Sequence, residues 1–461
     1  MGLSGIEIFK YLPRTNCGKC GVPTCLAFAM SLAAGKAELV SCPFITAESR
    51  TKLEEASAPP IRPITITTGN KPIKVGGETV LFRHEKRFEN PPGLAITISD
   101  VMSNEEIDRR LQAVKYYTYN RVGASLKPEL VALKYQSGNP EEYAALAKRA
   151  KTETEAGIIL VCEDVDGFLC AAEACLERKP ILCAVTESNL DLLAPIAIDL
   201  KLPVVARSNS IDGLAELTDR LVKLGIKDII LDSGARNVKR ALADQVTLRR
   251  LALLKKFRLL GYPTIAFPGE MTENPLKEAL IASVMVAKYA GIIVLSDFRG
   301  ETLFPLLVAR MNLFSDPQRP QATAEGIYPI NGPDENSPVA ITCNFSLTYF
   351  IVSGEIENTR VPVHLLIKDT EGLSVMTAWA AGKFGAENIG GFVKKSGIAD
   401  LVKHRKIIIP GYIAQESGGL EEQLPGWEIM VGPREASHIL SYLKSNWPAE
   451  KDLKPSRSEA P

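Results

Sequence analysis

The sequence has no excess of either charge, few histidines and no long apolar run. Lysine plus arginine and aspartate plus glutamate number 54 each, so no net positive field attracts phosphate backbones and we expect no nucleic-acid partner. No stretch reaches the roughly 20 apolar residues of a spanning helix, and the opening residues lack the apolar run of a signal peptide. These absences predict a cytoplasmic protein that does not cross a membrane.

Several motifs of nucleotide-binding proteins and enzymes are also absent. No G-x-G-x-x-G follows a candidate strand, and the chain has neither a Walker A lysine loop nor the G-x-S-x-G of a hydrolase. The four histidines are scattered without metal-ligand spacing, and each is interpreted as structural or solvated: His84, His364, His404 and His438. The sequence therefore gives no support for nucleotide binding, and we assign no catalytic side chain.

Cysteine, by contrast, is present in an informative arrangement. Nine cysteines suit a reducing compartment better than a disulfide framework. Four lie near the start with the spacing Cys17-x₂-Cys20-x₄-Cys25-x₁₆-Cys42, and four thiolates are what a 4Fe-4S cluster needs. Zinc is the main alternative, although zinc sites of this kind usually carry two Cys-x-x-Cys pairs and this chain has one. The spacing predicts an oxygen-sensitive iron–sulfur site, and the other five cysteines are interpreted as small core residues.

Composition changes along the chain predict an α/β protein with three folded parts. Short apolar runs alternate with amphipathic stretches in the middle of the chain, and eight such pairs fit a (β/α)₈ TIM barrel. A later, shorter alternation predicts a Rossmann-like open α/β sheet. The predicted divisions are a cluster domain at 1–57, a linker with a small hairpin at 58–92, the barrel at 93–315, a linker at 316–325, the open sheet at 326–446 and a disordered tail at 447–461.

Polar residues follow many of the predicted strands. In the barrel they include Ser99-Asp100, Arg207-Ser208-Asn209 and Ser296-Asp297, and helix capping or partner contact is favoured over catalysis there. The loops after the last four strands combine small residues with hydroxyl or amide donors. Capping explains each of these loops taken alone, whereas four of them along one sheet edge would also hold a large flat ligand.

At this point nearly the whole chain resembles the family of corrinoid iron–sulfur protein large subunits, including their archaeal relatives in the acetyl-CoA (Wood–Ljungdahl) pathway. The resemblance is carried by the opening IEIFKYLPRTNCGKCGVPTCLAFA, by the distal Cys42-Pro43 and by IKDTEGLSVMTAWAAGKF in the last domain. It implies a 4Fe-4S cluster on Cys17, Cys20, Cys25 and Cys42 and a base-off corrinoid in the last domain. The corrinoid contacts that it implies are Ala340, Ser346, Thr370, Glu371, Gly372, Leu373 and Pro433.

The resemblance also implies an activity and a set of partners. The family carries methyl groups: the corrinoid cobalt accepts one from methyltetrahydrofolate through a methyltransferase and donates it to the nickel site of acetyl-CoA synthase, while the cluster serves reductive reactivation of Co(II). The expected partners are a small subunit that completes a heterodimer, the methyltetrahydrofolate methyltransferase, acetyl-CoA synthase and a reductive activator protein. Cofactors of this kind supply the bond chemistry, and the protein supplies binding and orientation.

Two other hypotheses remain open at the level of sequence. One is a ferredoxin-like domain fused to a TIM-barrel pterin methyltransferase, which predicts pterin binding by the isolated chain. The other is an assembly scaffold with zinc in the first domain and an empty last domain. Iron, zinc and cobalt contents separate the three hypotheses.

Overall fold

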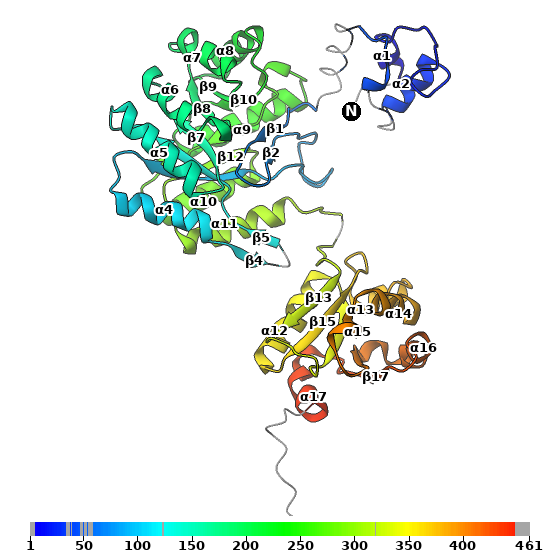
Figure 1. Ribbon diagram of the computed structural model, residues 1–461. Coiled ribbons are helices and arrows are strands. Elements are labelled where there is room, and N and C mark those ends of the chain that lie inside the picture. The colour runs from blue at the N-terminus through cyan, green and yellow to red at the C-terminus, as the bar shows by residue number, and fades with distance from the viewer. Residues whose placement is uncertain are drawn as a thin grey trace, which may run out of the picture. The chain divides into compact units, whose positions relative to one another are not determined.

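The computed structural model describes residues 5–33, 37, 39–46, 49, 53, 59–121, 124–318 and 320–447 (Figure 1). The chain divides into two compact units. One comprises Met1–Tyr119 and Leu126–Ser315, and the other comprises Asn120–Ser125 and Asp316–Pro461. The expected tail lies outside the described residues beyond Trp447, so its disorder remains a prediction. Within the described residues, no helix combines the length and apolar character needed to cross a bilayer.

The N-terminal segment is small and has its own core. It contains the helices α1 (Gly5–Phe9), α2 (Cys25–Ala33) and the short 3₁₀ helix η1 (Leu39–Ser41). Ile8, Leu12 and Phe28 pack together and are almost completely buried. The helix α2 begins at Cys25, the third cysteine of the spacing, and its described part ends at Ala33.

Eight parallel strands form the barrel, and all eight were predicted from the sequence. Their order in the sheet is β10-β9-β8-β7-β6-β3-β12-β11, and a parallel bridge between Leu231 and Thr264 joins the two outer strands. The strands are β3 (Gly93–Ser99), β6 (Leu130–Lys134), β7 (Gly157–Val161), β8 (Ile181–Val185), β9 (Val204–Arg207), β10 (Ile229–Asp232), β11 (Ile265–Ala266) and β12 (Ile292–Leu295). The nearly closed parallel barrel is confirmed.

Helices between the strands cover the outside of the barrel (Figure 1). They are α4 (Asn104–Tyr116), α5 (Pro140–Glu153), α6 (Val165–Ala174), α7 (Leu190–Asp199), α8 (Ile211–Lys223), α9 (Val238–Leu253), α10 (Pro275–Ala287) and α11 (Gly300–Leu313), with the short helices η2 (Leu176–Arg178), η3 (Arg258–Leu260) and η4 (Pro268–Glu270). The ribbon of β4 (Tyr119–Arg121) and β5 (Ala124–Leu126) contains residues 120–125, which belong to the other compact unit. Several of the helices begin with a side-chain cap: Asp164, for example, accepts from the backbone N–H of Gly167 at 2.7 Å. Capping thus accounts for part of the polar strand ends.

The segment expected to be a linker at 58–92 contains the predicted hairpin, but the described part is packed into the barrel. The strands β1 (Ile64–Ile66) and β2 (Ile73–Val75) pair antiparallel. Ile64, Ile66 and Val75 are buried in the same cluster as the inward residues of the barrel strands. Burial inside the barrel stabilises the alternating apolar residues of the hairpin. The Pro- and Gly-rich composition indicated a linker because it does not reveal this burial.

The second unit contains a five-stranded mixed sheet with the order β13-β15-β14-β16-β17. Its strands are β13 (Gly326–Ile330), β14 (Val339–Cys343), β15 (Val363–Lys368), β16 (Lys406–Ile409) and β17 (Glu428–Val431). All neighbouring strands are parallel except β13, which pairs antiparallel with β15 at one edge. The last four strands were predicted, and β13 was not.

Helices lie on both faces of this sheet (Figure 1), and a separate apolar cluster fills each face. One face is covered by α12 (Ser346–Thr359) and α17 (Ile439–Asn446), the other by α13 (Val375–Ala380), α14 (Ala386–Lys395), α15 (Ile398–Leu401) and α16 (Ser417–Gln423), with the 3₁₀ turns η5 (Gly411–Glu416) and η6 (Ala436–His438) after β16 and β17. The expected linker at 316–325 is partly in this unit, because the backbone N–H of Thr323 donates to the carbonyl of Asn344.

Candidate functional site

The backbone around the first three cysteines makes a tight loop that leads into a helix. Gly18 and Gly21 have φ of +71° and +85°, which only glycine adopts without strain. The side-chain oxygen of Asn16 accepts from the backbone N–H of Cys25 at 2.8 Å, where α2 begins. The loop therefore holds the first cysteines against the helix that carries the third.

Three of the four cysteines pack in one small apolar cluster. Cys25 and Cys42 are buried, Cys20 is half-buried and Cys17 is exposed. The backbone N–H of Lys19 and the hydroxyl of Thr15 lower the pKa of the Cys17 thiol. Within the described residues, no group of three Cys, His, Asp or Glu side chains has metal-coordinating geometry. Cys20, Cys25 and Cys42 share one apolar cluster, and Cys17 does not belong to it. Four thiols on such a loop fit an iron–sulfur cluster by their donor chemistry.

The remaining cysteines have a different environment. Burial raises the pKa of Cys162, Cys175 and Cys183 to about 12, which keeps each of them a neutral thiol. Cys183 and Cys343 lie in buried clusters among apolar side chains. These four environments suit core residues, whereas Cys170 on α6 is only half-buried.

An apolar cavity of about 330 Å³ lies in the second unit on the α12 and α17 side of the sheet. Among the parallel strands the order is β15-β14-β16-β17. The chain passes from β14 to β15 on one side of β14 and then from β15 to β16 on the other side, so the strand order reverses at β14. Ligands of open α/β sheets bind beside such a switch point, at the carboxyl ends of the strands. The cavity reaches that edge, since residues after β16 and β17 line it, among them Pro410, Tyr412 and Pro433.

The loops after β16 and β17 approach each other closely at this edge. A Cβ on Gly411 would lie 2.5 Å from the carbonyl oxygen of Gly432 and 2.9 Å from the backbone nitrogen of Arg434. The backbone N–H of Gly411 donates to the carbonyl of Pro433 at 3.1 Å. Glycine at 411 is thus required by the close contact, and it places Pro433 on the wall of the cavity.

One asparagine organises the loops after β14 and β15. The Oδ1 of Asn344 accepts from the backbone N–H of Thr370, from the hydroxyl of Thr370 and from the backbone N–H of Gly372, at 2.9 to 3.0 Å. Its Nδ2 donates to Asp369 at 2.8 Å. Thr370 is completely buried, and the single proton of its hydroxyl is shared between Asn344 Oδ1 and the carbonyl of Leu373, both at 2.9 Å. This network fixes the 370–373 turn, in which Glu371 and Gly372 both have positive φ.

Two hydroxyls near this turn are buried without a partner in the structure, Ser346 Oγ and Thr323 Oγ1. Buried polar groups of proteins are nearly always hydrogen-bonded, so each of these exceptions is a group that a ligand or a water molecule would satisfy. Ser346 is the first residue of α12, and its backbone N–H is already used by the carbonyl of Gln321. Its hydroxyl is therefore available to a further hydrogen-bonding partner.

Six of the seven residues proposed as corrinoid contacts lie at the carboxyl ends of β14, β15 and β17, whereas Ala340 is the second residue of β14. Ala340 and Pro433 line the cavity, whereas the other five lie at the carboxyl ends of β14 and β15. Sequence reasoning missed Asn344 as the residue that joins two loops, and it missed the apolar cavity wall from α12 and α17. Exposed apolar side chains on α12, Leu347 and Ile351, were the available signal.

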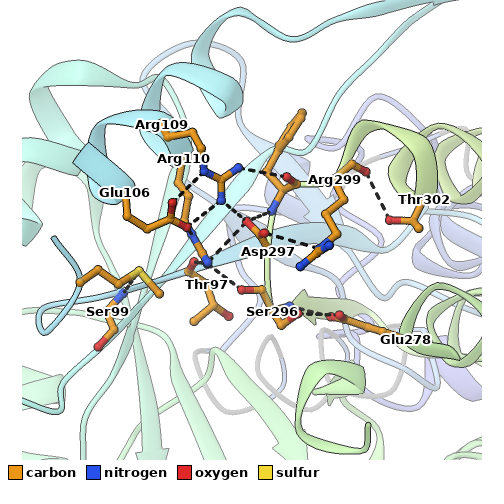
Figure 2. Close-up of polar contacts among 12 residues, drawn as sticks. Thr97, Ser99, Glu106, Arg109, Arg110, Glu278, Ser296, Asp297, Arg299 and Thr302 are labelled. Atoms are coloured by element: carbon orange, nitrogen blue, oxygen red, sulfur yellow. Dashed lines mark hydrogen bonds and ion pairs between the residues drawn. The ribbon is translucent and has the colours of Figure 1, made fainter. Parts of the chain in front are cut away.

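The polar strand ends of the barrel mostly bind one another. Burial alone would raise the pKa of Asp232, but the guanidinium groups of Arg236 and Arg207 lower it. Figure 2 shows a second group, in which the carboxylate of Asp297 forms ion pairs with Arg109, Arg110 and Arg299. These ion pairs join neighbouring strands and helices, which agrees with a scaffolding role.

Together these features define a multidomain α/β protein with a four-cysteine segment and, in a separate unit, an open sheet with a ligand-sized cavity. The family model "Putative Fe-S cluster" matches residues 12–44, and the model "CO dehydrogenase/acetyl-CoA synthase delta subunit" matches residues 63–443. The chain is 44% identical to the corrinoid/iron–sulfur protein large subunit of Moorella thermoacetica, over 97% of this chain and 99% of that protein.

Archaeal relatives extend this similarity. Over 96% of this chain, it is 33% identical to the acetyl-CoA decarbonylase/synthase complex subunits gamma of Methanothermobacter thermautotrophicus and Methanopyrus kandleri, covering 99% and 97% of them. The delta-subunit model begins after the cysteine segment, whereas these relatives match along the whole chain. The chain belongs to the family of corrinoid/iron–sulfur protein large subunits and acetyl-CoA decarbonylase/synthase gamma subunits.

Proposed function

We propose that this chain is the cofactor-bearing subunit of a methyl carrier in the acetyl-CoA pathway, with a 4Fe-4S cluster and a base-off corrinoid. The observation that carries the proposal is the presence, in one chain of this family, of a four-cysteine loop and a cavity at a sheet switch point. A bound corrinoid supplies a cobalt centre for methyl transfer, and a low-potential cluster supplies one-electron chemistry.

The chain's own residues hold each group. Cys17, Cys20, Cys25 and Cys42 would ligate the cluster, and Gly18 and Gly21 allow the loop to close around it. The corrinoid would lie along the edge formed by Ala340, Ser346, the 370–373 turn and Pro433. Asn344 orients that turn, Ser346 Oγ offers an unused hydrogen bond, and the apolar cavity excludes water from one side of the ligand.

Metal analysis under anaerobic conditions tests the proposal directly. We expect about four iron atoms and one cobalt atom per chain, with no zinc. Zinc in place of iron and no cobalt would support the scaffold hypothesis instead. Pterin binding by the isolated chain, without cobalt, would support a barrel methyltransferase.

The partners follow from the same proposal. We expect a heterodimer with the small subunit, which would cover the exposed apolar rim of the cavity at Ile351 and Met376. The methyltransferase, acetyl-CoA synthase and the reductive activator would meet this complex in turn. A large subunit that sediments alone from the native source would contradict the expected heterodimer.

Replacing Ser346 by alanine is expected to separate ligand binding from stability. The buried hydroxyl has no partner in the structure, so its removal should leave the apoprotein equally stable or more stable by up to about 1 kcal/mol. Corrinoid release should become faster, by about fivefold, because a hydrogen bond to the ligand is lost. Thermal unfolding of the apoprotein and corrinoid release into buffer measure the two effects. A less stable apoprotein with unchanged release would show that the hydroxyl is structural.

Histidine is not expected to ligate the cobalt. The Nε2 atoms of His364 and His404 are bonded to the carbonyls of Asp334 and Ser337, and both histidines lie near the amino ends of their strands. His438 is exposed and does not line the cavity. Electron paramagnetic resonance of the Co(II) form should therefore show cobalt lines without splitting by an axial nitrogen. Nitrogen splitting would exclude the base-off, histidine-off form.

A further inference from the structure

The interior of the barrel is not filled to its carboxyl end. A cavity of about 170 Å³ lies among β3, β6, β12 and η4, and Thr97, Val161, Phe267 and Val294 form its apolar walls. It is smaller than the roughly 300 to 1,000 Å³ of drug-sized sites. The carboxyl ends of barrel strands are where barrel proteins bind ligands. This cavity belongs to neither of the cofactor sites.

Hydrogen bonds among polar residues fix one wall of the cavity. Glu278, which is nearly buried, accepts both from the backbone N–H of Ser296 at 2.6 Å and from its hydroxyl at 2.5 Å (Figure 2). Arg110 donates to the carbonyls of Thr97 and Ser296. A Cβ on Gly269 would lie 2.8 Å from the Cβ of Ser296. These hydrogen bonds already satisfy the polar groups of Glu278, Ser296 and Arg110. None of the bonds has to break when a ligand enters the cavity.

The charged residues that line the cavity are Lys134 and Glu270. The ammonium of Lys134 lies 3.5 Å from Glu270, at the limit of a hydrogen bond, and is 37% exposed. Glu270 is bound more closely by Arg236, which also pairs with Asp232. Because Arg236 already holds Glu270, the ammonium of Lys134 keeps most of its capacity for another anion.

We propose that the mouth of this barrel binds a small organic carboxylate with a flat apolar body. The carboxylate accepts from Lys134 Nζ and from the amide nitrogen of Gln136, whose Oε1 already accepts from Ser99 at 2.7 Å. The body lies against Phe267 and Met102 on the apolar side. A single lysine suits one carboxylate, whereas phosphate groups are usually held by arginine forks or several backbone N–H groups. The inference does not rest on the proposed function.

Isothermal titration calorimetry of the purified chain tests the proposal. Benzoate is the probe, and benzamide is its neutral analogue. We expect saturable benzoate binding and affinity for benzamide at least about tenfold lower. Lys134→Gln should reduce benzoate affinity to that of benzamide. Lys223→Gln, an exposed lysine on α8 paired with Asp219, is the matched control and should change nothing.

A second variant keeps the test decisive. Val161→Phe fills the cavity from β7 and leaves Lys134 in place, so it should abolish benzoate binding while circular dichroism confirms the fold. Equal affinity for benzoate and benzamide, benzoate binding that survives Lys134→Gln, or heat that never saturates would each overturn the proposal. If inorganic phosphate competed with benzoate, the site would bind anions in general. That result would overturn the assignment of a carboxylate as the ligand class.

Discussion

Replacing Cys20 by alanine is expected to remove the iron–sulfur cluster and leave the corrinoid in place. Cys20 is half-buried in the same cluster as Cys25 and Cys42, and a 4Fe-4S cluster that loses one of four thiolates is not held intact. The corrinoid residues belong to the other compact unit. Iron should therefore fall from about four atoms per chain to near zero, with cobalt unchanged.

The same variant should separate two activities. Methyl transfer by protein that is already reduced should proceed at the wild-type rate, whereas reductive reactivation after oxidation should be lost. Cys170→Ala, a half-buried cysteine of α6 outside the four-cysteine loop, is the matched control and should keep both activities. If Cys20→Ala lowered both activities equally, the cluster would have a different role.

Replacing Asn344 by leucine is expected to lower both the stability of the second unit and its affinity for the corrinoid. The substitution leaves the backbone N–H groups of Thr370 and Gly372 without their shared acceptor, whereas the hydroxyl of Thr370 keeps the carbonyl of Leu373. A buried donor that loses its partner costs about 1 to 3 kcal/mol, and the turn can move to recover part of this loss. We therefore expect about 2 to 3 kcal/mol lower stability and at least tenfold weaker corrinoid binding.

Two comparisons distinguish a local from a general effect of this change. Asn336→Leu, at an exposed position in the same unit, should leave the unfolding free energy and corrinoid content unchanged within error. Thr370→Val removes one donor and should give a smaller loss than Asn344→Leu. Full corrinoid content in Asn344→Leu would show that the 370–373 turn does not contact the ligand.

The sequence by itself was sufficient where the chemistry is local. The spacing of Cys17, Cys20, Cys25 and Cys42 indicates a four-thiolate site because it is carried by side chains close together in the chain. The eight barrel strands were predicted because each is a short apolar run bounded by turn residues. The scattered positions of the four histidines were equally local, and they gave no metal-ligand spacing.

Only the tertiary structure decided features that depend on packing between distant segments. The hairpin of β1 and β2 is buried in the barrel because its alternating apolar residues find a surface that no local pattern reveals. The strand β13 joins the last sheet through antiparallel pairing with β15, which a search for parallel alternation does not detect. Asn344 reaches residues 26 to 28 positions away, and the barrel-mouth cavity arises where small and polar side chains of distant strands meet. Each of these depends on burial and hydrogen bonding that exist only after the chain has folded.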